Sequence, residues 1–462
     1  MFFERIYEEG LAQASYFVGC QATKEAIVID PKRDVDTYLK LADRKNYKIT
    51  HVTETHIHAD FLSGSRELAS LTGAKMLLSD EGGPDWQYQF DHTGLKHKDV
   101  FKIGNIQFEV LHTPGHTPEH ISFLLTDLPA SDKPSMIFTG DFVFVGDIGR
   151  PDLLEVAAGV EGSRIIGAKQ MFQSLKMFKE LPDYLQVWPG HGAGSACGKA
   201  LGAIPGTTIG YEKIYNWALK HTKEGPFVDE LLEGQPEPPK YFAMMKKLNK
   251  INRQIIPTIR KAKELSIAEL EKAIKEGMPV IDTRNKALFA YGHISGTINI
   301  QNNNDFSNWA GWLLNYNAPF VVIAEHGQID EVSRKLIRVG LDNLIGFFSN
   351  IDGWIEQHSM QALNHIESHE LKEVIAQNNC TIVDVRGINE YNSGHIKHAK
   401  HIHLGELKER AGELQKDNHI ILHCAGGDRS STACSILQKE GFLKITNLTG
   451  GFNAWAESEL ES

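Results

Sequence analysis

The chain has 462 residues, enough for about three domains of roughly 150 residues with ample buried apolar surface. Its formal charge is -11, with 59 acidic against 48 basic residues, which disfavours binding to nucleic acids and to anionic membranes. Five scattered cysteines form neither a disulfide framework nor a zinc pattern, and no run approaches the ~18 apolar residues of a membrane span. Because no long apolar signal core follows Met1, the sequence predicts a reducing, cytoplasmic location.

The first part of the chain alternates between predicted strands and helices. Residues 26–30 and 106–110 have the apolar pattern of strands, whereas residues 66–71 and 167–180 have that of helices. We therefore expect a mixed α and β domain at the start of the chain.

Histidines and aspartates gather at turn-like places in this first part. The residues concerned are His56, His58 and Asp60 in one motif, then His116, Asp141 and His191. Gly115 precedes one histidine in a sharp turn, and Asp141 follows an apolar run at 136–138 that predicts a buried strand. Imidazoles and carboxylates on strand-end loops are the ligands of a metal centre. Five further histidines lack such a context and are expected to be ordinary polar residues: His51, His92, His97, His112 and His120.

Phe61 stands where an H-x-H-x-D motif usually continues with a second histidine. A phenyl ring cannot bind a metal ion, so this position removes one ligand of a second ion. The sequence therefore favours a one-metal site over a two-metal hydrolase.

A Pro-rich passage at 234–239 and a basic, helical run to residue 260 predict a domain boundary or a wrapping segment. An internal repeat follows. Residues 280–284 and 291–294 recur at 382–386 and 393–396, a shift of 102 positions. Each copy alternates strands with helices, which predicts a small α/β unit with a parallel sheet.

The second copy carries a cysteine, Cys424, between a predicted strand at 420–423 and a predicted helix at 431–440. Helix N-terminal amides favour a thiolate there, Gly426 and Gly427 let the backbone curl around Sγ, and Arg429 can add positive charge. A buried structural cysteine and a phosphate-handling loop are the alternatives. The four residues between Cys424 and Arg429 suit a sulfur atom more than a phosphate.

The first copy departs from this pattern. Glu325 aligns with Cys424, and Asp330 aligns with Arg429. A carboxylate cannot take up sulfane sulfur, so this copy is expected to be a spacer or interface module. An acid or base role of Glu325 is the functional alternative.

These motifs carry a resemblance to known families. Residues 1–255 resemble the metallo-β-lactamase fold, an αββα sandwich, and are most similar to the persulfide dioxygenases, relatives of glyoxalase II. The resemblance implies one Fe(II) per chain, bound by His56, His116 and Asp141. It places three further motif residues around these ligands: His58, Asp60 and His191.

Two other segments of the first domain resemble the same family. Residues 149–152 match its Gly-Arg-x-Asp stretch, which implies that Arg150 and Asp152 bind substrate. Residues 191–199 resemble the subgroup that is fused to sulfurtransferases, and Cys197 is then a catalytic candidate near the pocket. A small buried residue is its alternative role.

The repeats resemble rhodanese domains, a degenerate one at 262–360 and an active one at 362–462. Cys424 would carry the persulfide, aided by Arg429, and Gly426 and Gly427 would bind substrate. The fold class expected for the whole chain is thus α/β and α+β multidomain.

The resemblance implies that the protein oxidises low-molecular-weight thiol persulfides with O2 to sulfite. Sulfur transfer to sulfite, or from thiosulfate in reverse, would follow in sulfide detoxification. We expect a homo-oligomer that binds neither nucleic acid nor membrane. Two alternatives remain: a glyoxalase II-like thioester hydrolase fused to a sulfurtransferase, and a sulfur-carrier scaffold without oxygenase activity.

Overall fold

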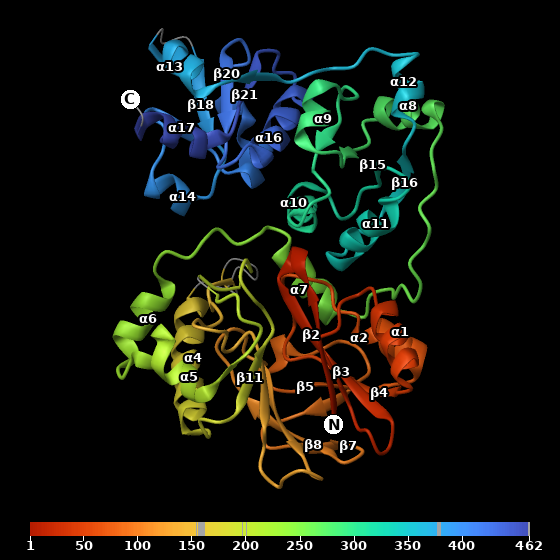
Figure 1. Cartoon of the computed structure of the whole chain (residues 1–462), viewed down its shortest axis with the longest axis vertical. Helices are drawn as coiled ribbons and strands as arrows, with labels where there is room; N and C mark the ends of the chain where they lie inside the picture. The colour runs from red at the N-terminus through yellow and green to blue at the C-terminus, as the bar shows by residue number, and fades with distance from the viewer. Residues whose placement is uncertain (154, 156–161, 196, 200, 377–379, 461–462) are drawn as a thin grey trace. The chain divides into compact units, whose positions relative to one another are not determined.

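The computed structural model describes residues 1–153, 155, 162–195, 197–199, 201–376 and 380–460. The chain divides into two compact units (Figure 1): Met1–Ile259 with Ile337–Gly340, and Arg260–Leu336 with Leu341–Ser462. No helix in the described ranges is long and apolar enough to cross a membrane.

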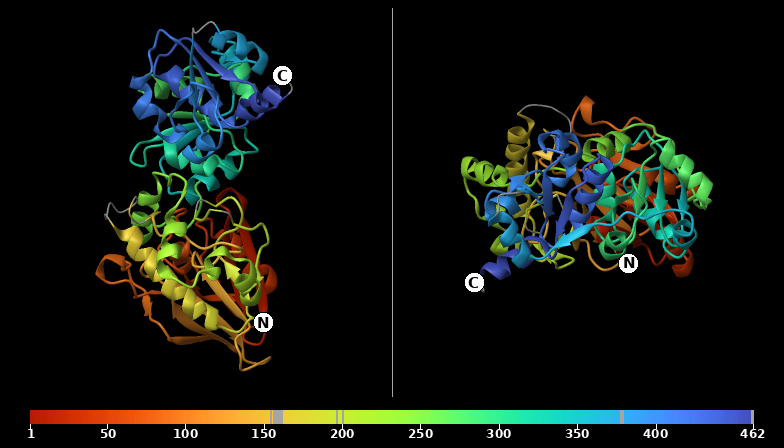
Figure 2. Two further views of the ribbon diagram at one scale, coloured as in Figure 1. Left: turned by 90° about the vertical axis from the view of Figure 1, so that its left-hand side faces the viewer. Right: turned by 90° about the horizontal axis from the view of Figure 1, so that it is seen from above.

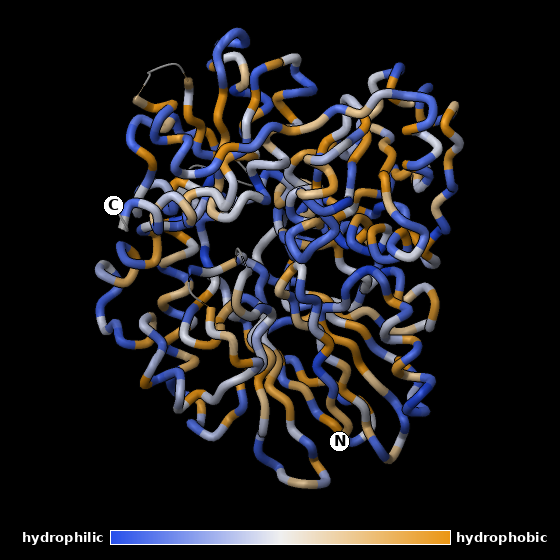
Figure 3. The backbone as a smooth tube through the Cα atoms, turned by 45° about the horizontal axis from the view of Figure 1, so that its top comes forward, coloured by the Kyte–Doolittle hydropathy of each residue, from blue (hydrophilic) through white to orange (hydrophobic). Residues whose placement is uncertain are grey.

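Two six-stranded sheets build the first unit. The first sheet has the order β1 (Phe2–Glu8), β2 (Gln13–Gly19), β3 (Glu25–Ile29), β4 (Lys48–Thr53), β5 (Lys75–Ser79) and β6 (Thr93–Leu95). The second has the order β12 (Thr207–Thr208), β11 (Gln186–Pro189), β10 (Met136–Gly140), β9 (Ile121–Asp127), β8 (Ile106–His112) and β7 (Val100–Ile103). Orange, apolar stretches run along many of these strands in Figure 3.

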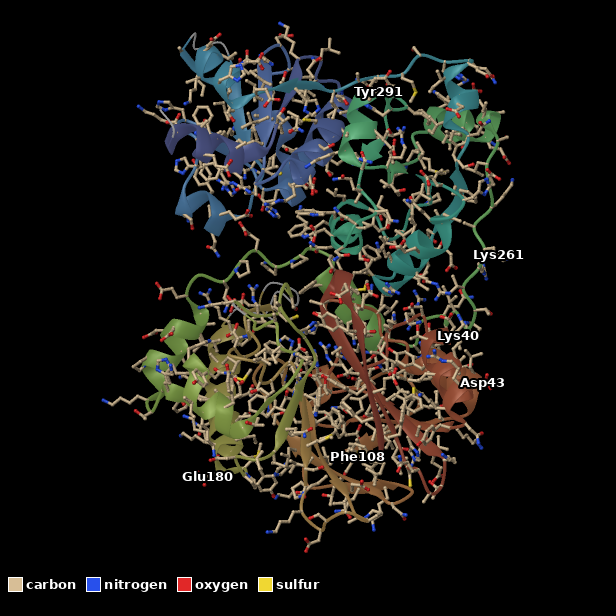
Figure 4. All side chains as sticks on the ribbon, in the orientation of Figure 1. Lys40, Asp43, Phe108, Glu180, Lys261 and Tyr291 are labelled. Atoms are coloured by element: carbon tan, nitrogen blue, oxygen red, sulfur yellow. The ribbon has the colours of Figure 1, made fainter. Side chains whose placement is uncertain are left out.

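The two sheets face each other across an aromatic core that includes Tyr16, Phe108 and Phe138. Figure 4 shows Phe108 among the strands, whereas Lys40 and Asp43 lie on an outer helix, α1 (Asp36–Lys45). Side chains of α1 and α2 (Ser65–Thr72) cover the first sheet. The long helix α4 (Ser163–Glu180) covers the second sheet (Figure 2). The resulting layers confirm the expected αββα sandwich.

Among its described residues, the first unit also contains the α-helices α5 (Ile209–Tyr215), α6 (Glu224–Leu232) and α7 (Phe242–Lys250). The predicted helical run to residue 260 is wrong beyond Lys250, because Ile251 leaves the helix with extended backbone angles. Asn249 on α7 donates to the carbonyls of His58 and Phe61 at 2.8 Å. The segment after the Pro-rich passage therefore wraps back onto the first unit.

The second unit contains two parallel sheets. The elements of the first repeat are α8 (Ile267–Lys275), β13 (Val280–Asp282), α9 (Lys286–Tyr291), β14 (Ile298–Asn299), α10 (Phe306–Leu313), β15 (Phe320–Ile323), α11 (Ile329–Arg338), β16 (Leu344–Phe348) and α12 (Ile351–Ile355). The elements of the second are β17 (Asn364–Ile366), α13 (Ser368–Ala376), β18 (Cys380–Asp384), α14 (Ile388–Ser393), β19 (Lys400–His401), α15 (Leu407–Arg410), β20 (His419–His423), α16 (Asp428–Lys439), β21 (Ile445–Leu448) and α17 (Gly451–Leu460).

The two repeats share one topology, as the sequence predicted. The strand order β14-β13-β15-β16 of the first corresponds to β19-β18-β20-β21 of the second, which adds β17 at its edge. A strand-end ion pair recurs with the same 2.6 Å distance, between Arg284 and Asp282 and between Arg386 and Asp384. The repeats also share a core, because the α9 side chain of Phe289 belongs to the same apolar cluster as buried side chains of β20 and α16. Helix α9 lies beside α16 in Figure 1.

Candidate metal centre and sulfur-transfer loop

Three buried side chains from three strand ends converge in the first unit. His56 follows β4, His116 lies between β8 and β9, and Asp141 follows β10. The Nε2 atoms of His56 and His116 lie 3.9 and 3.5 Å from Asp141 Oδ2. Two ligand atoms that are each about 2.1 Å from one ion lie about 3 to 3.5 Å apart, so this spacing suits a metal ion with little adjustment.

The atoms that face this point need a partner. His56 Nε2 and both carboxylate oxygens of Asp141 are buried without a hydrogen-bond partner among the described residues. A buried unsatisfied carboxylate is costly, and a bound cation would remove that cost. His56, His116 and Asp141 therefore fit a two-histidine, one-carboxylate metal centre.

Surrounding groups fix the imidazoles with Nε2 turned inward. His116 donates from Nδ1 to the Arg150 carbonyl at 3.0 Å. Thr55 donates its hydroxyl to Asp30, so its oxygen accepts from His56 Nδ1 at 3.0 Å. Burial lowers the pKa of both histidines, most strongly that of His56, and keeps them in the neutral form that binds metal.

The turn before His116 needs a glycine. Gly115 has φ +149°, and a Cβ atom there would lie 2.6 Å from the Met171 backbone of α4. The sequence predicted a sharp turn at this position, and the close approach of α4 gives the physical reason for it.

His58 faces Asp30 with one ring nitrogen, and its other nitrogen, Nδ1, is buried without a hydrogen-bond partner among the described residues. Its Nε2 lies 3.0 Å from Asp30, and this carboxylate outweighs burial to raise the pKa of His58 to about 9. The buried ring of Phe61 packs 4.4 Å from the His58 ring. An apolar side chain thus occupies the place where a further ligand would stand.

Asp60 and His191 lie on the other side of Asp141. His191 Nε2 is 3.2 Å from Asp60 Oδ2 and 3.4 Å from Asp141 Oδ1, while its Nδ1 donates to the Ala12 carbonyl. Cys197 joins them, since one ligand atom of each of Asp60, His191 and Cys197 lies within 4.8 Å of the others. Burial, helped by the two carboxylates, raises the pKa of the Cys197 thiol.

Arg150 and Asp152 pair with each other. The Arg150 guanidinium donates to both carboxylate oxygens of Asp152, at 2.8 and 2.5 Å, and also to the Pro236 carbonyl. Arg150 is almost completely buried. The contact of this pair with the metal centre runs through the Arg150 backbone carbonyl, which holds His116.

Four residues of the site had no signal in the sequence. His120 Nε2 accepts from the Asp141 amide at 3.1 Å, Asp30 binds His58, and Asn249 supports the motif loop. Glu119 accepts from the Ile57 amide, and burial raises its pKa to about 7. Each of these four residues takes part through tertiary contacts. The packing of neighbouring segments against the motif loop, residues 56–61, brings them to the site.

In the second unit, Cys424 lies between β20 and α16 and is buried. The Gly427 amide donates to its Sγ at 3.0 Å, and the Ser430 hydroxyl at 3.6 Å. Gly427 has φ +98°, which other residues rarely adopt, so the loop needs a glycine to curl around the sulfur. α16 begins at Asp428, three residues before the predicted start.

Arg429 interacts with two groups, the Glu390 carboxylate and Cys424. It binds Glu390 through two hydrogen bonds of 2.5 and 2.8 Å, and these bonds outweigh burial to raise its pKa. The positive charge that the sequence assigned to Cys424 is thus partly neutralised by a carboxylate that the sequence did not indicate. In the first repeat, Asp330 instead pairs with Arg334 at 2.8 Å, and Glu325 is exposed.

An αββα sandwich with imidazole and carboxylate side chains at its strand ends defines the class of metallo-hydrolase-type folds. Residues 9–191 match the metallo-β-lactamase superfamily, and residues 266–354 and 367–458 match the rhodanese-like domain. The chain belongs to the metallo-β-lactamase superfamily and carries two rhodanese-like domains.

Its similarity to solved structures includes a metallo-β-lactamase from Staphylococcus aureus subsp. aureus COL. The two share 44% identity with a TM-score of 0.67, over 75% of this chain and 98% of that one. A hydroxyacylglutathione hydrolase from Rhodospirillum rubrum is 32% identical over 176 residues, which are 38% of this chain and 60% of that protein. The putative sulfur carrier protein YrkF from Bacillus subtilis is 35% identical over 103 residues, 21% of this chain and 56% of that protein. The chain therefore spans little more than half the length of these two curated relatives.

Proposed function

We propose that the protein is a persulfide dioxygenase coupled to a sulfurtransferase. In the first unit, a thiol persulfide, O2 and water would give the free thiol and sulfite: RSSH + O2 + H2O → RSH + H2SO3. The observation that carries this proposal is the convergence of His56, His116 and Asp141, in which His56 Nε2 and both Asp141 oxygens lack a hydrogen-bond partner among the described residues. The ring of Phe61 stands beside this group in place of a further histidine.

One Fe(II) per chain, bound by these three residues, would supply open coordination positions and one-electron chemistry for O2. The protein's own contribution is orientation and charge. Neutral His56 and His116 offer Nε2 lone pairs, and Asp141 offers the anionic oxygens. Hydrogen bonds that the two Nδ1 atoms donate to the Arg150 carbonyl and the Thr55 hydroxyl oxygen keep both rings in that orientation.

Cys197 is proposed to hold a sulfane sulfur beside this centre. It is buried within reach of Asp60 and His191, so a persulfide on its Sγ would be shielded from water. Arg150 and Asp152 are proposed to order the substrate side of the pocket through the loop that carries the His116 partner.

The second unit would carry the sulfur transfer. Cys424 would accept a sulfane sulfur from a second persulfide and release the thiol. Sulfite would then attack the outer sulfur of the Cys424 persulfide, giving thiosulfate and the free Cys424 thiolate. The Gly427 amide and the N-terminus of α16 support the negative charge on sulfur in both steps.

The test is O2 uptake with a panel of thiol persulfides, including those of glutathione and coenzyme A, with the products identified. We expect one O2 consumed for each sulfite formed. Protein prepared without oxygen should contain one tightly bound iron per chain. Two tightly bound zinc ions per chain, both needed for activity, would contradict the proposal.

A thioester hydrolase is the second candidate, and one observation favours it. Asp60, His191 and Cys197 form a second group of potential ligands next to the first, and a relative is named as a hydroxyacylglutathione hydrolase. A two-metal hydrolase would use a bridging hydroxide and consume no O2. Turnover of an acylglutathione without O2 uptake would favour this candidate.

The likeness of 103 residues of this chain to a putative sulfur carrier keeps a third option, a carrier scaffold without oxygenase activity. If Cys424 takes up sulfane sulfur but no persulfide in the panel causes O2 consumption, the scaffold is favoured.

A further inference from the structure

The first repeat forms part of the surroundings of Cys424, although it has a glutamate in place of its own cysteine. A cavity of about 200 Å³ opens at Cys424 between the repeats. One wall comes from the loop at Cys424, residues 424–427, which we call the sulfur-transfer loop, and from α16. The opposite wall comes from the first repeat: Gln301, Asn303, Asp305 and Trp309. The site at Cys424 is therefore incomplete without the first repeat.

Lys286, the first residue of α9, reaches from the first repeat into the sulfur-transfer loop. Its Nζ donates to the Gly426 carbonyl at 2.7 Å and pairs with Asp428 Oδ1 at 2.6 Å. The Gly426 carbonyl and the Gly427 amide belong to one peptide group, and that amide donates to Cys424 Sγ at 3.0 Å. The ammonium thus holds one end of the peptide whose other end binds the sulfur.

This arrangement has two physical effects. Holding the carbonyl fixes the rotation of the peptide, so that its N–H points at Sγ. A cation on the carbonyl also polarises the peptide and strengthens its N–H as a donor, because hydrogen bonds in a chain reinforce each other. Gly427 admits the close approach, since a Cβ there would lie 3.3 Å from Lys286 Nζ.

The first repeat holds Lys286 firmly. The Lys286 amide donates to the Gln301 side chain at 2.7 Å, and Asn285 caps the start of α9. Two contacts dock the first repeat on α16: Ser431 donates to the Asn299 side chain at 2.9 Å, and the Asn299 amide donates to Ser435 at 3.0 Å. The position of Lys286 relative to the loop therefore follows from the fold of both repeats.

We propose that Lys286 is a positioning residue for Cys424, through which the cysteine-free first repeat completes the sulfur-transfer site of the second. The inference rests on the proposed sulfur transfer for its biological meaning. The contact itself is independent of that function and can be tested separately.

The experiment compares the full chain with Lys286→Met and Lys286→Arg. Iodoacetamide alkylation at pH 7 is followed on the Cys424 peptide by mass spectrometry, which separates it from the other four cysteines. Sulfur transfer from thiosulfate to cyanide is measured in parallel. Lys272→Met is the control, because Lys272 is an exposed lysine of the same repeat that pairs only loosely with Glu276 at 3.9 Å.

We expect Lys286→Met to slow both alkylation and turnover by about tenfold, the effect of losing one charge-assisted hydrogen bond. Lys286→Arg should restore most of both rates, since a guanidinium can reach the same carbonyl. Thermal unfolding of each variant identifies a folding defect, and the arginine variant carries the test if the methionine variant unfolds.

Alkylation of Lys286→Met within twofold of the original chain would overturn the inference, as would an equal loss in both Lys286 variants. If the original chain alkylates at Cys424 but transfers no sulfur, the proposed function fails, while the comparison of alkylation rates still decides the role of Lys286.

Discussion

At the scale of single residues, the metal centre depends on orientation as much as on ligand type. His58 belongs to the same motif as His56, yet its Nε2 faces Asp30, which raises the pKa of the ring, whereas the hydrogen bond to Thr55 directs His56 Nε2 inward. Residues outside the proposed ligand set, Asp30 and Thr55, therefore orient both histidines of the motif.

Asp141 is the only anion in the proposed ligand set, so its removal should cost most of the metal affinity. We expect Asp141→Ala to lose the bound iron and all O2 uptake while it stays folded. Metal content after anaerobic reconstitution measures this directly. Asp43→Ala, at an exposed position of α1, serves as the control and should keep both properties. Full metal content in Asp141→Ala would remove Asp141 from the ligand set.

Cys197 tests the sulfur relay next to that centre. Cys197→Ser keeps the size of the side chain but removes the sulfur, so persulfide oxidation should slow several-fold while the iron content stays unchanged. Stopped-flow O2 consumption and metal analysis separate the two effects. Cys20→Ser, at a buried cysteine of the same unit, is the control. Unchanged oxidation kinetics would make Cys197 a structural residue.

At the scale of elements, much of the fold follows from sequence patterns because strand and helix interiors carry strong periodicity. The residues at which helices begin and end are predicted less accurately from the sequence. α4 begins at Ser163 rather than at residue 167, because Gly162 in the left-handed region allows the chain to enter the helix earlier. α7 ends at Lys250, where Ile251 turns to extended backbone angles, and Pro257 further along cannot continue a helix.

The residues of the candidate site also fall into a group that the sequence predicts and a group that it does not. The sequence motifs contain the residues that converge, His56, His116 and Asp141, because each motif occupies a strand end. His120 and Asn249 were not predicted, because their roles arise from contacts with distant segments rather than from local spacing. Glu390 was missed for the same reason, and it changes the electrostatic surroundings of Arg429.

A buried ion-pair group ties α2 to the wrapping segment that follows α7. Glu67 on α2 is fully buried and binds Arg33 at 3.1 Å and Arg253 at 2.6 Å. Burial alone would raise the pKa of Glu67, but the two arginines outweigh it and hold the pKa below its usual value. A depressed pKa stabilises the fold above the unfolded-state pKa, and this contribution is lost as pH falls through the folded-state pKa.

Glu67→Gln should therefore lower the free energy of unfolding by about 3 kcal/mol at pH 7, because Arg33 and Arg253 lose the carboxylate that balances their charge. The difference from the original chain should shrink below about pH 4, where the carboxylate of the unfolded chain is protonated. Urea unfolding at several pH values measures this. Glu180→Gln, at the exposed end of α4, should change stability little at any pH. A difference that does not depend on pH would contradict the electrostatic explanation.

At the scale of the whole molecule, one chain joins a proposed source of sulfite to a thiol that can use it. Covalent linkage raises the effective concentration of one site at the other without any new contact. Fusion of the two proposed sites in one chain would therefore favour the use of sulfite from the first site at the second.

Cys424→Ser should leave O2 uptake nearly intact and shift the product from thiosulfate to sulfite, because a serine hydroxyl is too weak an acid to replace the thiolate. Product analysis by chromatography of both anions decides this. Cys434→Ser, at a buried cysteine in the middle of α16, is the matched control. An unchanged thiosulfate ratio in Cys424→Ser would show that the second repeat does not perform the transfer.

The apolar cluster shared by the two repeats constrains how this gene can change over evolution. Phe289 and Ala290 of the first repeat pack among the interior side chains of the second. Deletion of the first repeat would expose these interior side chains of the second repeat to solvent, although the first repeat contains no cysteine. Natural selection is thus expected to preserve the packing face of the first repeat more strictly than the exposed position of Glu325.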